Sequence, residues 1–218
     1  MPKALCAWGG WEGHTPAASM NLYVPWLQAG GFEVDVVNGS AVYADAERMA
    51  QYQLIVQCIT MATIKPEEEQ GLLAAVKAGA GLGGWHGGLA DSFRQNTDYQ
   101  WMVGGQWVAH PGGLIDYTVQ IIVPDDPLTQ GLPAEFPVHS EQYYLHVDPG
   151  NRVLATTTFS GEHAPWVAGT VMPVVWTRYY GQGRVFFCAL GHQAPEFSAQ
   201  PVARELVRRG LLWAGHAL

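Results

Sequence analysis

The first 90 residues alternate between strand-like and helix-like segments, and this alternation restricts the chain to few folds. Short apolar or alternating runs at 3–9, 32–39 and 53–58 are typical of β-strands. The clearest helix, 65–81, has Pro66 near its first turn, three glutamates at its positive end and glycine at its exit. Strands that alternate with helices over short connections form right-handed crossovers and a parallel sheet.

Three further segments continue this pattern. Residues 14–31 have a helical character that ends at a glycine pair, although Pro25 is expected to kink or shorten the helix. Residues 45–52 are predicted to form a short helix. The stretch AGLGGWHGG at 80–88 is predicted to be a short strand that runs into a turn. This half of the chain therefore supplies the parallel part of a sheet.

The second half changes to a succession of strands. Segments rich in aromatic and β-branched residues predict strands at 115–123, 141–147, 152–159, 172–180 and 183–192. The glycines at 181–183 indicate a hairpin, and 201–215 closes the chain as an amphipathic helix. The sequence thus predicts a layered α/β sandwich, with a mostly parallel sheet and an antiparallel extension, in a single domain over 1–218.

Composition and charge argue against several classes of partner. The chain has 218 residues, of which 48% are hydrophobic, enough for one sizeable core. The net charge is −8 and the 11 Lys and Arg are scattered, which argues against nucleic acid or an anionic membrane as a partner. No stretch approaches the ~20 apolar residues of a membrane span, and no signal peptide is recognisable. We therefore expect a cytoplasmic protein.

His86 stands where two glycine pairs indicate a sharp turn. The pattern Gly84-Trp85-His86-Gly87-Gly88 has the spacing of a nucleophile elbow, with an imidazole at the central position. Such a turn needs small residues two before and two after its centre, because the backbone doubles back and strains the central residue. Ligands of open α/β sheets bind beyond the carboxyl ends of the strands, so His86 is a candidate site residue.

Four other histidines can reach the same edge of the sheet. His14 follows the first predicted strand and His192 follows the last, while His110 and His139 lie in turn-rich segments. Because the carboxyl ends of parallel strands share one edge, we expect these imidazoles to gather in one cleft with His86.

Gathered imidazoles can bind a metal ion, transfer protons or hydrogen-bond a polyol. The spacing selects none of these, because no HExxH pair is present and a metal would be held by distant segments. The candidate metal ligands are His14, His86, His139 and His192. Glu141 and Asp91 are candidate carboxylates, as a base, a metal ligand or a hydrogen-bond partner of a histidine.

Aromatic rings lie beside the glycine and histidine motifs. Flat apolar rings next to polar groups suit stacking on the faces of sugars. The candidate substrate-binding residues are Trp11, His14, Trp85, Asp91, His110, His139 and Tyr143. The candidate catalytic residues are His86, Glu141 and His192.

In their order along the chain, these motifs resemble the trehalose-utilisation ThuA-like family, whose fold is similar to that of class I glutamine amidotransferases. The resemblance extends over most of the chain and includes GHTP, GAGLGGWHGG, DDPLTQGLP, HSEQYY and PVVWTRYYGQGRVFFCALGH. It implies a flavodoxin-like three-layer sandwich.

Carried over position by position, the resemblance places His86 where an amidotransferase holds its cysteine nucleophile. His192 matches the place of the catalytic histidine, and Glu141 matches an acidic position of the family. An imidazole cannot form the thioester that glutamine hydrolysis requires, so glutaminase activity is disfavoured. The cysteines lie in apolar segments away from this turn and are expected to be buried free thiols. They are Cys6, Cys58 and Cys188.

The resemblance further implies a role in carbohydrate catabolism, with action on a disaccharide, a glycoside or its 3-keto derivative alongside a partner oxidoreductase. Our leading hypothesis is an enzyme that uses acid–base chemistry of histidine and carboxylate groups. Two alternatives stay open: a non-catalytic carbohydrate-binding or regulatory protein, and a metal-dependent hydrolase that uses a divalent ion. A homodimer is also compatible with the sequence.

Overall fold

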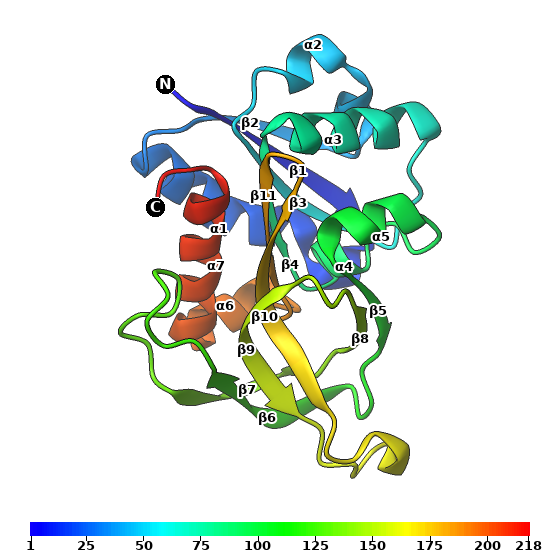
Figure 1. The fold of residues 1–218 in the computed structure, drawn as a ribbon, viewed down its shortest axis with the longest axis vertical. Coiled ribbons are helices and arrows are strands. Elements are labelled where there is room, and N and C mark those ends of the chain that lie inside the picture. Colours follow the sequence, from blue (N-terminus) through cyan, green and yellow to red (C-terminus); the bar gives the residue numbers. More distant parts are fainter.

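A nine-stranded sheet runs through the computed structural model, which describes residues 1–218 (Figure 1). Five neighbouring strands are parallel. In order across the sheet they are β2 (Glu33–Asn38), β1 (Lys3–Gly10), β3 (Leu54–Thr60), β4 (Gly81–Trp85) and β11 (Gly183–Cys188). The chain leaves β1 toward one edge and β3 toward the other, which creates the kind of crevice where ligands bind in open α/β sheets.

The other four strands extend the sheet in antiparallel fashion. Outward from β11 they are β10 (Val171–Tyr180), β9 (Arg152–Thr158), β6 (Leu114–Ile121) and β7 (Glu135–Glu141). A separate two-stranded sheet pairs β5 (Gly105–Ala109) with β8 (Tyr144–Val147). The predicted combination of a parallel sheet and an antiparallel extension is confirmed.

Helices cover both faces of the parallel strands (Figure 1). On one face lie α1 (Pro16–Ala29) and α7 (Pro201–Ala214), and on the other lie α3 (Pro66–Ala78) and α5 (Thr97–Val103). The short helices are η1 (Glu12–His14), η2 (Ala41–Ala44), α2 (Ala46–Met49), α4 (Gly87–Ala90), η3 (Pro165–Val167) and α6 (Ala194–Ala199). This is the predicted three-layer α/β arrangement. None of the helices combines the length and the apolar character that a membrane span requires.

Two local expectations are wrong. Of the two effects expected at Pro25, a kink or a shortened helix, the shortening is wrong, because α1 continues beyond it to Ala29. Pro25 and Asn21, whose carbonyl loses its helical partner, are both exposed, so water can satisfy that carbonyl. The strand predicted at 141–147 is β8 over its last four residues only, because the chain turns at Gln142 and Tyr143. Glu141 is instead the last residue of β7, a strand that was not predicted. This turn ends β7 at one of the predicted catalytic residues.

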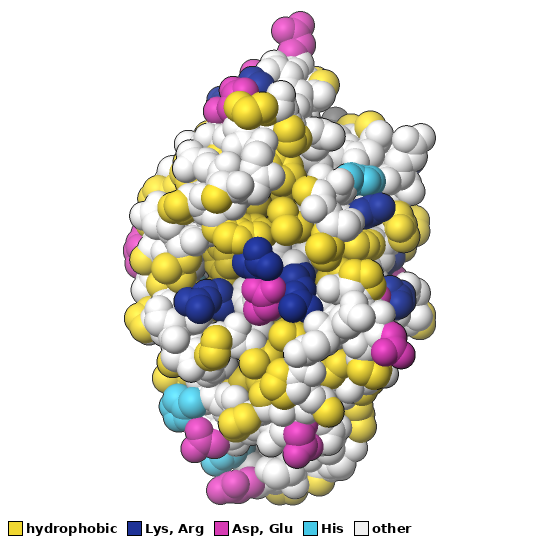
Figure 2. Space-filling view, turned by 90° about the vertical axis from the view of Figure 1, so that its left-hand side faces the viewer, with side chains coloured by type: hydrophobic (Ala, Val, Ile, Leu, Met, Phe, Trp, Pro, Cys, Tyr) yellow, Lys and Arg dark blue, Asp and Glu magenta, His cyan; other side chains and the backbone are white.

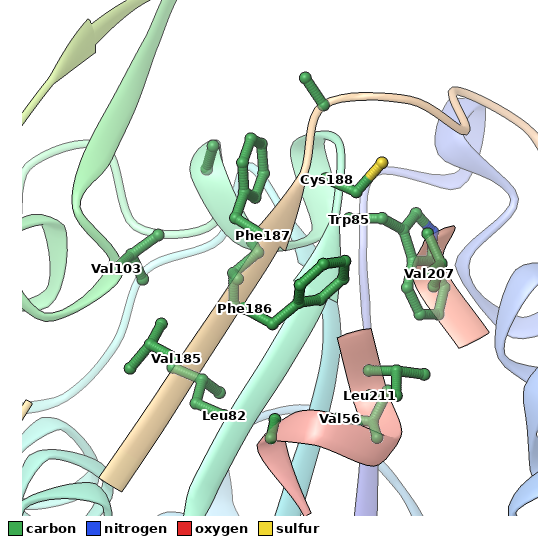
Figure 3. Close-up of a cluster of buried hydrophobic side chains, with 14 of the residues drawn as sticks. Val56, Leu82, Trp85, Val103, Val185, Phe186, Phe187, Cys188, Val207 and Leu211 are labelled. Carbon is green, nitrogen blue, oxygen red and sulfur yellow. The ribbon is translucent and has the colours of Figure 1, made fainter. Parts of the chain in front are cut away.

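The core between the sheet and α7 contains a residue that we expected to touch substrate. Trp85, at the end of β4, is only 1% exposed, and its ring packs on Tyr23 at 4.7 Å and on Phe197 at 5.8 Å. Phe186 and Leu211 are buried in the same region (Figure 3). Because its ring is not open to a ligand, Trp85 fills the core and does not stack on a sugar.

The strand β4 consists largely of glycine because α7 approaches its backbone closely. A Cβ atom added at Gly81 would lie 2.0 Å from the carbonyl oxygen of Ala214. One added at Gly83 would lie 2.6 Å from Cδ2 of Leu211. Carbon atoms in contact are normally about 3.5–4.0 Å apart, so the glycines are needed for the helix to pack directly on the strand.

The face that carries α1 and α7 is mostly uncharged (Figure 2). Several basic side chains gather around an acidic one near the middle of the view among hydrophobic side chains, while other acidic side chains lie toward its upper and lower ends. On α7, Glu205 accepts hydrogen bonds from Arg208 at 2.9 Å and from Arg209 at 2.8 Å. This face therefore presents paired charges rather than a continuous basic surface.

Replacing Trp85 with Ala should lower the free energy of unfolding by about 3–5 kcal/mol, because the change removes a buried ring and leaves a cavity. Trp166, which is 84% exposed in η3, is the matched control. Trp166→Ala should change that free energy by less than about 0.5 kcal/mol. Urea denaturation followed by circular dichroism measures both, and equal midpoints for the two variants would contradict the buried position of Trp85.

Candidate active site

His86 is held in a strained turn at the end of β4. Its φ of 47° and ψ of −139° lie in a region that favours glycine, at a cost of about 1–3 kcal/mol. Backbone hydrogen bonds hold this conformation. The N–H of His86 donates to the carbonyl of Cys188 at 2.7 Å, and its own carbonyl accepts from the N–H of Ala90 at 3.1 Å. The structure thus contains the predicted strand and sharp turn, and the short helix α4 follows them.

The glycines after His86 make room for two neighbours. A Cβ atom at Gly87 would lie 2.3 Å from Cε1 of His14. One at Gly88 would lie 2.8 Å from Cα of Cys58 in β3. The glycine pair therefore lets a second imidazole pack directly against the turn.

Four side chains from distant segments converge at this turn. His14 follows β1, His86 follows β4 and His192 follows β11, so the three imidazoles meet at the carboxyl edge of the parallel strands. Glu141 reaches them from the end of β7. Its Oε2 lies 3.0 Å from Nε2 of His86, 3.3 Å from Nδ1 of His192 and 4.0 Å from Nε2 of His14. One ligand atom from each residue lies within 4.8 Å of all the others. We call these four residues the histidine cluster.

The backbone determines which nitrogen of His86 carries a proton. Its Nδ1 lies 2.8 Å from the carbonyl oxygen of Ala189, and a carbonyl can only accept, so Nδ1 is the donor. In the neutral ring, the lone pair of Nε2 then faces the carboxylate of Glu141. Two acceptors at this distance repel each other unless a proton or a metal cation lies between them.

Burial and mutual proximity set the charges of the histidine cluster. Burial, and then the neighbouring imidazoles of His86 and His192, lower the pKa of His14 from 6.5 to about 3, so its ring is neutral at neutral pH. Burial alone would raise the pKa of Glu141, but His192 and His86 beside it lower that pKa well below its usual range. A neutral imidazole and an ionised carboxylate are the forms that bind metal ions.

The donor set of the histidine cluster fits a divalent transition metal. Imidazole nitrogens and carboxylate oxygens bind Zn²⁺ at about 2.0–2.2 Å, which places neighbouring ligand atoms about 3–3.5 Å apart. The 3.0 and 3.3 Å separations from Glu141 to His86 and His192 agree with this spacing. The buried Nδ1 of His192 makes no well-aligned hydrogen bond, as expected for a nitrogen whose partner is a cation.

A layer of hydrogen bonds orients these side chains. Thr60, at the end of β3, places its hydroxyl 3.1 Å from Nδ1 of His14. Glu196 of α6 accepts from the N–H of His192 at 3.0 Å and from the hydroxyl of Ser140, next to Glu141, at 2.9 Å. One carboxylate thus ties the loop of His192 to the strand that carries Glu141.

Two further predicted residues lie beside the histidine cluster. The ring of Tyr143 stacks on His86 with 3.9 Å between centroids, and burial raises its pKa well above the usual value. Asp91 is buried and accepts from Nη2 of Arg94 at 2.8 Å, while burial raises its pKa. Neither is open enough to be a main contact for substrate, so both support the residues in front of them.

The opening of the site is marked by Trp11 and His110. The half-exposed ring of Trp11 meets His14 edge-on at 4.9 Å. Nε2 of the partly exposed His110 lies 3.7 Å from Oε1 of Glu141. Glu141 therefore presents one oxygen to the three buried imidazoles and the other to a histidine that solvent can reach.

His139 does not join the histidine cluster. It lies on β7, the edge strand of the sheet, where its exposed Nδ1 is 2.8 Å from Oδ1 of Asp116 on β6. Glu141, two residues further along the same strand, lies in the histidine cluster, whereas His139 does not.

Three residues of the site were not among the predicted ones: Thr60, Arg94 and Glu196. A usable signal existed for Thr60, because extending the predicted strand 53–58 to its true end would have placed this hydroxyl at the same edge as His14. Arg94 stands three residues after Asp91 and Glu196 four residues after His192, so each lay close in sequence to a predicted site residue. The contacts of Glu196 with Ser140 and of Arg94 with Trp107 form only when distant segments meet.

Solved structures share the fold across nearly the whole chain. A ThuA-like protein of Parabacteroides merdae is 21% identical, with a TM-score of 0.79 over 99% of this chain and 90% of that one. A ThuA-like protein of Bacteroides uniformis is 18% identical, with a TM-score of 0.78 over 98% and 91%. A cytoplasmic protein of Salmonella typhimurium is 17% identical, with a TM-score of 0.67 over 99% and 98%. At these identities the likeness shows the fold alone.

Sequence comparison adds the family. Among curated proteins, none matches this sequence. The family model ThuA, described as trehalose utilisation, matches residues 3–214 and so covers the sheet, its helices and the whole histidine cluster. The chain therefore belongs to the ThuA family.

Proposed function

We propose that this chain is an enzyme of carbohydrate metabolism that acts on a disaccharide, a glycoside or its keto derivative, with a divalent metal ion in the histidine cluster. Membership of a family described as trehalose utilisation supports the role in carbohydrate metabolism. The observation that carries the proposal is the convergence of three imidazole nitrogens and one carboxylate oxygen within 4.8 Å.

The metal explains the arrangement of His86 and Glu141. Its cationic charge would lie between the lone pair of Nε2 and the carboxylate, which otherwise repel each other. A divalent ion held by these residues would supply Lewis acidity toward a substrate oxygen or a water that takes a coordination position beyond the four protein atoms. The zinc-like donor set of three nitrogens and one oxygen favours a transition metal over Mg²⁺ or Ca²⁺.

The chain itself provides acid–base groups at the opening. With Oε2 of Glu141 turned to the buried imidazoles, Oε1 and Nε2 of His110 form a pair 3.7 Å apart that substrate can reach. A carboxylate and an imidazole at that separation can exchange a proton with a hydroxyl or with a carbon next to a carbonyl. Trp11 offers a half-exposed ring on which a sugar can stack.

Glutamine hydrolysis is not part of the proposal. His86 stands at the centre of the elbow, where that reaction needs a thiolate. The three cysteines are buried, and burial raises the pKa of each thiol to about 12. A keto-sugar substrate would instead require a partner oxidoreductase, because a ketone arises by oxidation of a sugar hydroxyl.

Two other functions remain as outcomes of experiment. If the histidine cluster works without metal, a proton shared by His86 and Glu141 would relieve their repulsion, and the reaction would depend on acid–base chemistry alone. If the protein only binds carbohydrate, the same aromatic rings would hold a sugar that is never converted.

Purified protein incubated with Zn²⁺ and then dialysed should retain one equivalent of metal. His192→Ala should weaken binding by more than about 100-fold, beyond the 10–100-fold typical of losing a supporting hydrogen bond. Calorimetry and elemental analysis measure this, with His139→Ala as the matched control that binds as the parent does. Retention of one equivalent with parental affinity by His192→Ala would refute the metal site.

Glu141→Gln should lower kcat/KM for a 3-keto glycoside by at least about 100-fold, because it removes a metal ligand and a proton acceptor together. His110→Ala should lower kcat by about 10²–10⁴-fold while metal content stays at one equivalent, because the change removes an acid–base group that is not part of the histidine cluster. Product analysis by chromatography checks both, with His139→Ala as the control. Binding of the glycoside by the parent without any product would point to the non-catalytic alternative.

A further inference from the structure

A cavity of about 380 Å³ lies beside the histidine cluster, between the loop after β3 and the loop before α5. Its lining residues are Met61, Ala62, Thr63, Ile64, Phe93, Arg94, Gln95 and Asn96. The cavity thus follows the C-terminal end of a central parallel strand, which is the edge where open α/β sheets bind ligands. Its volume is within the range of small-molecule sites, about 300–1,000 Å³.

One wall of the cavity leads directly to His14. Met61 follows Thr60, whose hydroxyl contacts Nδ1 of His14. The backbone N–H of Met61 donates to the carbonyl of Asp91 at 2.9 Å, so the two lining loops are joined at their base. Met61 has a φ of 51°, an uncommon value for a non-glycine residue, and its half-exposed side chain stands at the rim.

The other wall leads to Glu141. The guanidinium of Arg94 lies over the ring of Trp107, 4.5 Å from its centroid. Trp107 lies 5.7 Å from the ring of His110, which contacts Oε1 of Glu141. A continuous path of contacts therefore runs from one end of the histidine cluster, along the cavity, to the other end.

The lining suits a neutral polyol rather than an anion. Asp91 binds Arg94 through Nε and Nη2 and neutralises its charge, which leaves three of its five N–H donors for hydroxyl groups. Oδ1 of Asn96 accepts from the N–H of Tyr99, so the amide of Asn96 keeps its two donors. Half of the lining residues are hydrophobic, as a sugar ring with one apolar face requires.

A second cavity, of about 520 Å³, is a poorer candidate. It lies over the antiparallel strands and includes Asp116, Thr118 and His139, which point to solvent from the outer sheet. The contacts that link His14 to Glu141 through Thr60, Arg94 and Trp107 do not pass along this second cavity. It therefore provides a matched site for a control substitution.

We propose that the cavity between Met61 and Asn96 binds the second, neutral sugar unit of a disaccharide whose first unit lies at the opening of the histidine cluster. This inference rests on the proposed function for the identity of the first unit. It makes the substrate at least two units long, because a monosaccharide would leave this cavity empty.

Thr63→Trp tests the subsite, because the new ring would fill the cavity from an exposed position. Thr118→Trp makes the same change in the second cavity. Calorimetry compares neutral disaccharides, trehalose among them, with the methyl glycosides of the same sugars. The parent and Thr118→Trp should bind a disaccharide at least about 10-fold more tightly than its methyl glycoside. Thr63→Trp should lose this preference while it keeps its affinity for the methyl glycoside.

Equal affinities of the parent for both sugars, or an undiminished preference in Thr63→Trp, would overturn the subsite. If only Thr118→Trp lost the preference for the disaccharide, the second sugar unit would bind in the other cavity. This result would also overturn the proposed subsite. Because the readout is binding, these results are independent of turnover. A parent with the disaccharide preference but without bound metal or product would refute the proposed function and leave the subsite standing. Melting curves and Zn²⁺ content show that both Trp variants are folded.

Discussion

The hydrogen bond from Nδ1 of His86 to the carbonyl oxygen of Ala189 is the contact on which the site depends. It comes from the loop after β11, so the neighbouring parallel strand selects the tautomer of the elbow histidine. In the neutral ring, this choice aims the lone pair of Nε2 at Glu141. The side chains around this pair, including the neutral ring of His14, can all bind a cation at the centre of the histidine cluster.

The topology of the sheet brings the four residues of the histidine cluster together. Parallel strands bring their carboxyl ends to one edge, and three histidines follow three of these ends. The fourth member arrives differently, because the antiparallel extension curves back until the end of β7 meets that edge (Figure 1). The parallel half therefore supplies the imidazoles, and the extension supplies the carboxylate.

Local patterns predicted the parts of the site that local geometry decides. The elbow at His86 depends on glycines within two residues of it, and the end of β1 follows from a short apolar run, so the sequence shows both. The strand predicted at 183–192 is too long, because β11 ends at Cys188 and His192 lies in the loop that follows. The role of His139 could not be read in the same way, because its exposure depends on β7 being the edge strand. Trp11 and Trp85 both lie next to glycines, but only the packing of α6 and Tyr23 buries the second ring.

The histidine cluster also joins parts of the chain that lie far apart in sequence. His14 belongs to the beginning of the chain and His192 to its end, while the protein's cysteines are all free, so no disulfide links these segments. An ion held by both would act as a reversible cross-link between the N-terminal strand, the closing helices and the antiparallel extension. The coordination bonds would thus restrict the same long loops that disulfides restrict in secreted proteins, and would release them when the metal leaves.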